Sequence, residues 1–119
     1  MTDYKQVYVA FVHYAASRNQ ADWCELWIVC NRRMAALVKT KARKLSVPLP
    51  EGDIDDVIND STCRVMKALK EASDVTEAFI SKTFWHENLH AFTLYNRDKE
   101  KVRRDEKIAK RLNDIFFLN

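Results

Sequence analysis

Apolar side chains recur at three- and four-residue steps along most of this chain, the spacing that collects them on one face of an α-helix. The first such pattern predicts a helix from about Asp3 to Ser17. A second helix is expected from Asp22, which forms a D-x-x-E capping box with Glu25, to about Leu45. The first half of this second helix is apolar nearly all round, so we expect it to lie in the centre of the core.

Two further helices are predicted after a linker. The segment SVPLPEG, residues 46–52, contains both prolines and interrupts the helical pattern. A third helix is expected from about Asp53, with acidic residues in its first turn, where the helix dipole favours them. A second D-x-x-E box at 74–77 predicts the start of a fourth helix, and helical spacing continues from there toward Asn113. The pattern leaves open whether this helix is straight or bends near Arg97.

The composition favours an all-α protein of one domain. With one glycine and two prolines in 119 residues, the chain lacks the regularly spaced turn residues that a sheet protein needs. Its 47% apolar and 31% charged residues are typical of a packed core under a solvated surface. Residues 1–119 are therefore predicted to form a single helical domain.

The cysteines and the hydropathy predict an intracellular protein. Cys24, Cys30 and Cys63 fall inside helical patterns, and we expect buried free thiols in a reducing compartment. No apolar run is long enough to span a membrane, and the N-terminus lacks a signal-peptide pattern. We therefore expect a cytoplasmic protein with no membrane partner.

Charged residues are segregated into three blocks. Residues 31–44 contain six basic residues and no acid, and residues 51–60 contain five acids and no base. Residues 97–111 contain eight basic residues and four acids. Blocks of opposite sign create local electric fields on one small surface, although a solvated helix face accounts for each block taken alone.

One segment has a more specific pattern. Residues 53–69, DIDDVINDSTCRVMKAL, resemble the second conserved region of bacterial sigma factors without a gap. That region has an acidic pair, then Leu-Val-Gln-Glu, an aromatic residue and an Arg-x-aromatic-Arg-Ala-Leu ending. The segment AFISKTF, residues 78–84, is similar to the start of the family's DNA-melting helix, so the resemblance covers about residues 25–104. The positions that match in the first segment are Asp55, Asp56, Val57, Ile58, Asn59, Asp60, Arg64, Lys67, Ala68 and Leu69.

The chain departs from the family's pattern at several positions. Asn59 replaces a glutamine, Thr62 replaces an aromatic residue, and His86 and His90 replace an asparagine and an aspartate. No helix-turn-helix that reads an upstream promoter element follows the match. The chain therefore looks most like the reduced, sigma-like late-transcription factors of phages, which leaves open a second protein factor as the reader of that element.

The resemblance implies a four-helix bundle like sigma region 2, with a long basic C-terminal helix. In the family, the acidic third helix docks on a coiled coil of the largest subunit of bacterial RNA polymerase. An acidic helix face that meets basic partner residues supplies steering and register. The candidate polymerase-binding residues are Asp55, Asp56, Asn59, Asp60, Arg64 and Lys67.

The fourth helix is the expected site for single-stranded promoter DNA. Exposed bases need an aromatic stacking surface, and the DNA backbone needs cations. Aromatic and basic residues alternate on this helix, although aromatics at helical spacing are more often core residues, as we expect for Phe84 and Phe92. The candidate DNA-binding residues are Lys82, Trp85, His86, Tyr95, Arg97, Lys99, Lys101, Arg103 and Arg104.

A competing motif lies on the same helix. The sequence HENLH places His86 and His90 one turn apart with Glu87 between them, as in zinc hydrolases. Asn88 is polar where zinc peptidases place an apolar residue, and no third ligand is framed downstream. We therefore predict neither a metal nor another cofactor. The leading hypothesis is a sigma-like factor that is not an enzyme; an independent helical DNA-binding or polymerase-modulating protein comes second, and a zinc-dependent hydrolase third.

The basic helix continues into a hydrophobic tail, so that residues 97–119 form a separate C-terminal segment. The tail itself, IFFL at residues 115–118, is expected either to fold back on the core or to dock as a peptide on a partner.

Overall fold

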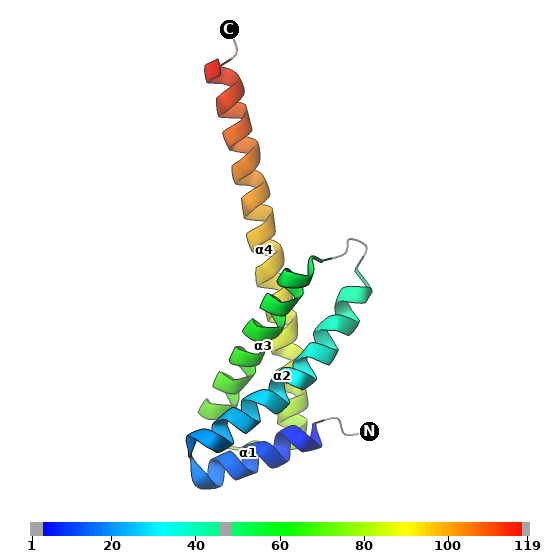
Figure 1. Ribbon diagram of the computed structural model, residues 1–119, viewed down its shortest axis with the longest axis vertical. Coiled ribbons are helices and arrows are strands. Elements are labelled where there is room, and N and C mark those ends of the chain that lie inside the picture. The colour runs from blue at the N-terminus through cyan, green and yellow to red at the C-terminus, as the bar shows by residue number, and fades with distance from the viewer. Residues whose placement is uncertain (1–3, 46–48, 118–119) are drawn as a thin grey trace.

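Four helices make up the described part of the chain in the computed structural model, which covers residues 4–45 and 49–117, with side chains up to Asn113. They are α1 (Lys5–Ser17), α2 (Gln20–Arg43), α3 (Glu51–Glu71) and α4 (Glu77–Phe117). These ranges contain no strand, which confirms the all-α prediction (Figure 1). The predicted helix starts are correct to within one turn, except that Asp3 lies outside the described residues.

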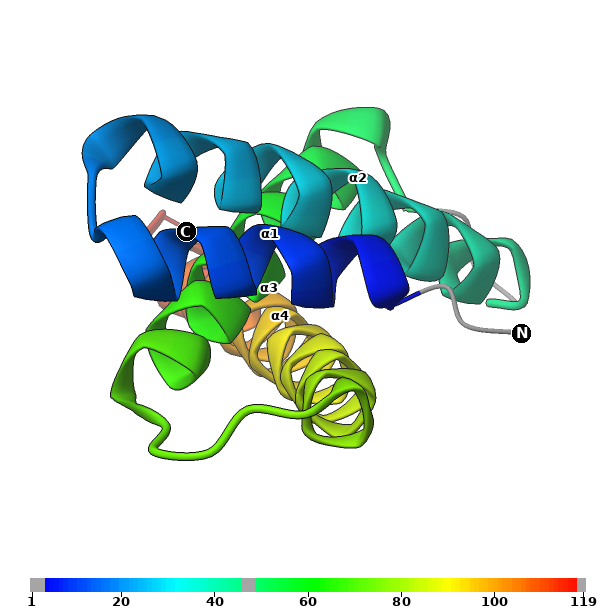
Figure 2. The ribbon, with the colours of Figure 1, turned by 90° about the horizontal axis from the view of Figure 1, so that it is seen from below.

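The helices pack as a bundle from which α4 projects. α1 and α2 lie side by side and run in opposite directions (Figure 2); α3 packs against α2, and the first half of α4 packs mainly against α3. The turn between α1 and α2 is tight because Arg18 adopts a left-handed conformation (φ 55°) and its N–H donates to the Tyr14 carbonyl at 2.7 Å. α3 packs against both α2 and α4, so its two flanks are fixed by different neighbours.

Side chains from all four helices form the hydrophobic core. Val7 of α1, Leu26 of α2, Val65 of α3 and Phe84 of α4 are all fully buried. Phe92 is also buried, so both phenylalanines lie in the core as predicted. The other buried apolar residues are Ala10, Tyr14, Cys30, Met34, Val38, Val57, Ile58, Met66, Leu69, Ile80 and Ala91.

The first half of α2 is less buried than its composition suggests. We expected residues 23–30 to be central to the core, but only Leu26 and Cys30 are buried there, and Ile28 is 45% exposed. The expectation was too broad, because the neighbouring helices cover only part of the circumference of α2. Trp23, Trp27 and Val29 are half-buried and pack at the margin of the core, and Ile28 faces solvent.

The two predicted capping boxes are also wrong. α2 is capped by Asn19, whose extended backbone lets its side-chain oxygen accept from the Asp22 N–H at 2.8 Å. At the start of α4, the Thr76 hydroxyl accepts from the Phe79 N–H at 3.1 Å. Several polar residues that favour N-caps stand before each helix, and the backbone conformation decides which of them caps it.

The cysteines were expected to be buried free thiols, and only one of them is. Cys30 lies in the core, where burial raises the pKa of its thiol to about 12 and keeps it protonated. Cys24 and Cys63 are free but exposed, because they fall on the solvent sides of α2 and α3. The position of a cysteine within a helical pattern therefore did not predict whether it is buried.

α4 is one uninterrupted helix of 41 residues and does not break at Arg97. From Asn96 onward every described side chain is exposed, and the helix runs away from the bundle (Figure 1). We call residues 96–117 the arm. The arm explains why the radius of gyration is 19.1 Å, whereas a compact chain of this length has about 13.5 Å. None of the helices in the described ranges is both long and apolar enough to cross a membrane.

The backbone of the predicted hydrophobic tail continues the arm as far as Phe117 and does not turn back toward the bundle. Its last residue, Leu118, and the side chains of the tail lie outside the described residues.

Candidate functional site

The six predicted polymerase-binding residues share one face of α3, which we call the α3 face. The helix buries Val57, Ile58, Val65 and their neighbours against the bundle, so the opposite side points to solvent. Five of the six are exposed and Arg64 is half-buried. The six residues selected from the sequence therefore lie together on one face of the structure.

Two contacts define the edges of the α3 face. On the α2 side, Asn31 donates from its side-chain nitrogen to Asn59 Oδ1 and to Thr62 Oγ1, both at 3.2 Å. On the other edge, Arg64 Nε donates to Asp60 Oδ2 at 3.1 Å, one turn along the same helix. Asp55 and Asp56, at the N-terminal end, are exposed, and the acidic character of the face is concentrated there.

Thr62 occupies the position at which the sigma pattern has an aromatic residue. It is fully buried, and its hydroxyl donates to the Ile58 carbonyl at 2.8 Å. A small β-branched side chain fits there because Asn31 of α2 approaches it closely. This departure from the family's pattern is thus accommodated inside the bundle and does not change the exposed face.

Asp53 joins the start of α3 to the beginning of the arm. Its Oδ2 accepts from the Tyr95 hydroxyl at 2.6 Å and lies 3.2 Å from Lys99 Nζ. The Tyr95 hydrogen bond, followed by Lys99, lowers the pKa of Asp53. Desolvation, followed by the bond to Asp53, raises the pKa of Tyr95 to about 12. Tyr95 and Lys99, both predicted to bind DNA, therefore also hold α4 against α3.

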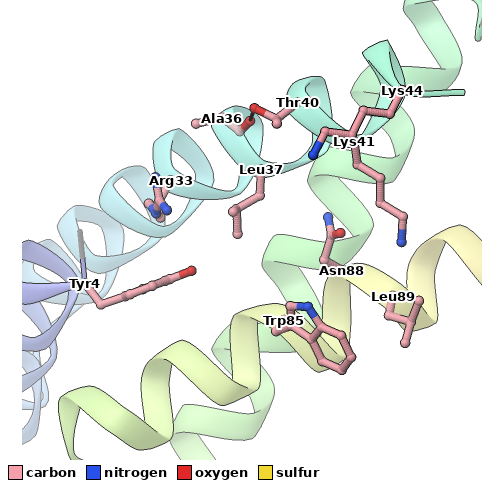
Figure 3. A pocket seen from close by; sticks show the side chains of 10 residues that line it. All are labelled: Tyr4, Arg33, Ala36, Leu37, Thr40, Lys41, Lys44, Trp85, Asn88 and Leu89. Atoms are coloured by element: carbon pink, nitrogen blue, oxygen red, sulfur yellow. Dashed lines mark hydrogen bonds between the residues drawn. The ribbon is translucent and has the colours of Figure 1, made fainter. Parts of the chain in front are cut away.

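A groove of about 510 Å³ lies between α2 and α4 (Figure 3). None of its lining residues is acidic. Its cations come from α2, and its aromatic rings come from Trp85 of α4 and from Tyr4, just before α1; we call it the α2–α4 groove. Its lining residues are Tyr4, Arg33, Ala36, Leu37, Thr40, Lys41, Lys44, Trp85, Asn88 and Leu89.

The two aromatic side chains of the α2–α4 groove differ in how they are held. Trp85 is 64% exposed, although it stands beside the fully buried Phe84. Tyr4 is fixed: its ring packs edge-on against Phe84, with centroids 5.2 Å apart, and the Arg33 guanidinium lies 5.0 Å from its centroid. Trp85 is thus available to stack on a planar ligand, while Tyr4 forms a rigid wall.

Asn88 forms the polar floor of the α2–α4 groove. It is only 8% exposed, and its side-chain nitrogen donates to the Met34 sulfur at 3.6 Å. A thioether is a weak acceptor, so this amide retains most of its hydrogen-bonding capacity. In Figure 3 it points into the space between α2 and α4, near Lys41 and Trp85. The Lys41 ammonium lies over the Phe92 ring, 4.7 Å from its centroid, which orients this cation at the groove.

Of the residues that line the α2–α4 groove, only Trp85 was among the predicted site residues; the aromatic and basic residues that the prediction missed are Tyr4, Arg33, Lys41 and Lys44. The sequence did carry a signal for three of them, since they belong to the acid-free basic block of residues 31–44. Nothing in the sequence indicated that this block faces Trp85, because that depends on how α2 packs against α4.

A second hollow, of about 720 Å³, lies on the outer side of α4 and is lined in part by Lys82, His86, His90 and Arg97. The Trp85 and His86 rings meet edge-on with centroids 5.6 Å apart, so Trp85 stands between this hollow and the α2–α4 groove. Among the described residues, no three His, Cys, Asp or Glu side chains come close enough to hold a metal ion. The HENLH sequence therefore lacks the third ligand that a zinc site needs.

The predicted DNA-binding residues thus divide into three groups. Lys82, Trp85, His86 and Arg97 are exposed on α4 along the bundle and at its edge, where Trp85 lines the α2–α4 groove and the other three line the second hollow. Tyr95 and Lys99 contact Asp53. The remaining three are fully solvent-facing residues of the arm: Lys101, Arg103 and Arg104.

No protein-family model, curated protein or solved structure matches this chain. The kind of partner that each surface binds is therefore inferred from the residues of the α3 face and of the α2–α4 groove. The α3 face presents carboxylates and an amide, which suit a basic protein surface. The α2–α4 groove presents rings, an amide and cations without acids, which suit bases joined by a phosphate backbone.

Proposed function

We propose that this chain is a sigma-like transcription factor. In this proposal, the α3 face docks on the largest-subunit coiled coil of bacterial RNA polymerase, and α4 with the α2–α4 groove holds single-stranded promoter DNA. The protein then acts in the bacterial cytoplasm as a binding factor, without catalysing a reaction.

The observation that carries the proposal is the separation of two exposed surfaces of opposite charge on one small bundle. Asp55 and Asp56 are exposed at one end of α3, whereas the α2–α4 groove combines Trp85 with Arg33, Lys41 and Lys44 and has no acidic lining residue. A protein that bridges a basic polymerase surface and a polyanion needs both surfaces at once. The resemblance of residues 53–69 to the sigma pattern supports the same division of roles.

The test is capture of purified bacterial core RNA polymerase at low salt, where electrostatic docking is strongest. We expect the native chain to capture the enzyme and the variant Asp56→Arg/Asp60→Arg to lose it. The matched control is Glu71→Arg/Asp74→Arg, which makes the same change in net charge at exposed positions outside the α3 face. Equal loss in both variants, or no capture by the native chain, would contradict polymerase docking.

A second candidate function is an independent, sequence-tolerant DNA-binding protein, and the α2–α4 groove is the observation that favours it. Stacking on an aromatic side chain contributes about 1–3 kcal/mol per base and does not require polymerase. Titration of a labelled single-stranded oligonucleotide with the protein alone decides between the two. Tight binding that Trp85→Ala weakens, together with a failure to capture polymerase, would favour this candidate.

A further inference from the structure

The outer side of α4 carries a line of mostly basic side chains that continues from the bundle onto the arm. Its members are spaced by three, four or seven residues, so they stay on one side of a 3.6-residue helix. Every member is exposed. We call this line the α4 stripe, and it consists of Lys82, His86, Thr93, Arg97, Arg104, Lys107 and Arg111.

Within the arm, the charges are sorted by side. Arg97, Arg104 and Arg111 repeat at seven-residue intervals, two helical turns apart. Between Arg97 and Arg111 the one acid in line with them is Glu100, which lies 4.0 Å from Arg104. The helical repeat turns the other acids of that range, Asp98, Asp105 and Glu106, away from the stripe, and Asp114 follows three residues after its last member. The α4 stripe is therefore the basic side of the arm.

We propose that the arm binds the phosphate backbone of double-stranded DNA through the α4 stripe, next to the single strand held at the bundle. The inference rests on the proposed function for the position of the single strand, but not for the duplex contact itself. The partner is recognised by backbone charge and by the width of a groove that admits an α-helix.

Two features favour a duplex over a single strand as the partner of the arm. A single strand is held by stacking on aromatic rings as well as by cations, and no aromatic residue lies among the basic residues of the stripe from Arg97 to Arg111; the aromatic residues of the arm, Phe116 and Phe117, come after its last member. Trp85 and Tyr4, by contrast, lie on the bundle. The division of aromatics and cations along α4 thus matches a junction at which paired DNA meets unpaired DNA.

The length of the α4 stripe is also suitable for contact with duplex DNA. From Lys82 to Arg111 the stripe spans about 44 Å along the helix axis at the ordinary rise per residue. From Arg97 to Arg111 it spans about 21 Å, over which duplex DNA carries roughly twelve phosphate charges. Because the arm projects away from the bundle, nothing in the described part of the chain covers it from the stripe side (Figure 1).

The test measures binding of the full chain to three labelled probes without polymerase: a blunt duplex, a single strand and a fork that joins the two. The principal variant is Arg104→Gln/Lys107→Gln/Arg111→Gln, which keeps good helix formers at every position. We expect the dependence of log K on log salt for the duplex to become shallower by up to about 2.7, at about 0.9 for each phosphate that the variant no longer neutralises. In this arrangement Arg104 is reassigned from single-stranded to duplex DNA and the single strand stays on the bundle, so we expect single-strand affinity to stay within about twofold of native.

A matched pair of single variants controls for net charge. Lys107→Gln removes a charge from the α4 stripe, whereas Lys110→Gln removes one from the side that carries Glu106. Both lysines are exposed residues of the arm, so neither change disturbs the core. The salt dependence should fall by about one for Lys107→Gln and should not change for Lys110→Gln.

The outcomes separate this inference from the proposed function. A native chain that binds the fork more tightly than either simpler probe, and that loses this gain in the triple variant, supports the duplex contact. Duplex binding with an unchanged salt dependence in the triple variant overturns it and assigns the stripe to another partner. If the native chain fails to bind the single strand while its duplex binding still depends on the stripe, the arm inference stands and the single-strand role of the groove is wrong.

Discussion

The two halves of α4 have the same backbone conformation but are stabilised in different ways. Residues 77–95 bury Ile80, Phe84, Ala91 and Phe92 against the other helices. Residues 96–113 bury no side chain, so apart from the contact of Lys99 with Asp53 the interactions described for them are local. These include the pair of Glu100 and Arg104, and such exposed pairs contribute a few tenths of a kcal/mol.

The composition of the arm explains why it stays helical where it projects from the bundle. It contains no glycine or proline and is rich in lysine and arginine, which favour helix without tertiary support. The first turn of a helix is costly to form, whereas each added residue is not, so the arm depends on the bundle as its nucleus. One half of the helix supplies stability, and the other half presents charge.

Within α4, the largest loss of stability is expected when Phe84 in the bundle half is substituted. Phe84→Ala should lower the free energy of unfolding by about 3–5 kcal/mol, because it empties a fully buried site. Trp85→Ala, one residue along and 64% exposed, should change it by less than about 0.5 kcal/mol. Urea unfolding measures both. Similar losses for the two variants would mean that the exposed side of α4 is packed in solution.

A matched pair of glycine substitutions separates the two halves directly. Ala91→Gly in the bundle should lower the free energy of global unfolding by about 1 kcal/mol. Ala109→Gly in the arm should leave the urea midpoint unchanged and reduce only the helical signal in circular dichroism. If Ala109→Gly shifted the midpoint as much as Ala91→Gly, the arm would be part of the cooperative unit.

The smallest change in stability is expected for the contact between Tyr95 and Asp53, at the boundary between the two halves of α4. It should be visible only at extremes of pH. Asp53 has a lowered pKa, so its contribution to stability is present above its ordinary pKa and is lost as the pH falls through the folded value. Tyr95 has its pKa raised to about 12, so its contribution is lost as the pH rises from its ordinary value of about 10 toward 12.

Thermal unfolding as a function of pH measures this linkage. Tyr95→Phe should remove the alkaline loss of stability and weaken the acidic one, since Asp53 keeps only Lys99. The control is Tyr8→Phe, which removes a hydroxyl from a partly buried tyrosine of α1 and should leave the alkaline loss in place. An identical pH profile for Tyr95→Phe and the native chain would contradict the role of this hydrogen bond.

Helical periodicity determined much of the fold and one of the two surfaces. The spacing of Val57, Ile58 and Val65 already placed Asp55 and Asp56 on the opposite side of their helix, and the α3 face followed from it. The same logic succeeded for Phe84 and Phe92 and failed for Ile28. A periodic pattern identifies the apolar side of a helix, but it does not tell how much of that side the neighbours cover.

The sequence by itself determined the four helices, the separation of charge along the chain and the exposed acidic face, because each depends on residues within one helix. Only the tertiary structure decided the α2–α4 groove, in which Tyr4, Arg33 and Trp85 come together from three segments far apart in sequence. It also decided that Tyr95 bonds to Asp53 and that α4 leaves the bundle after that contact. Such pairings depend on how side chains of different helices interlock, which no single helix specifies.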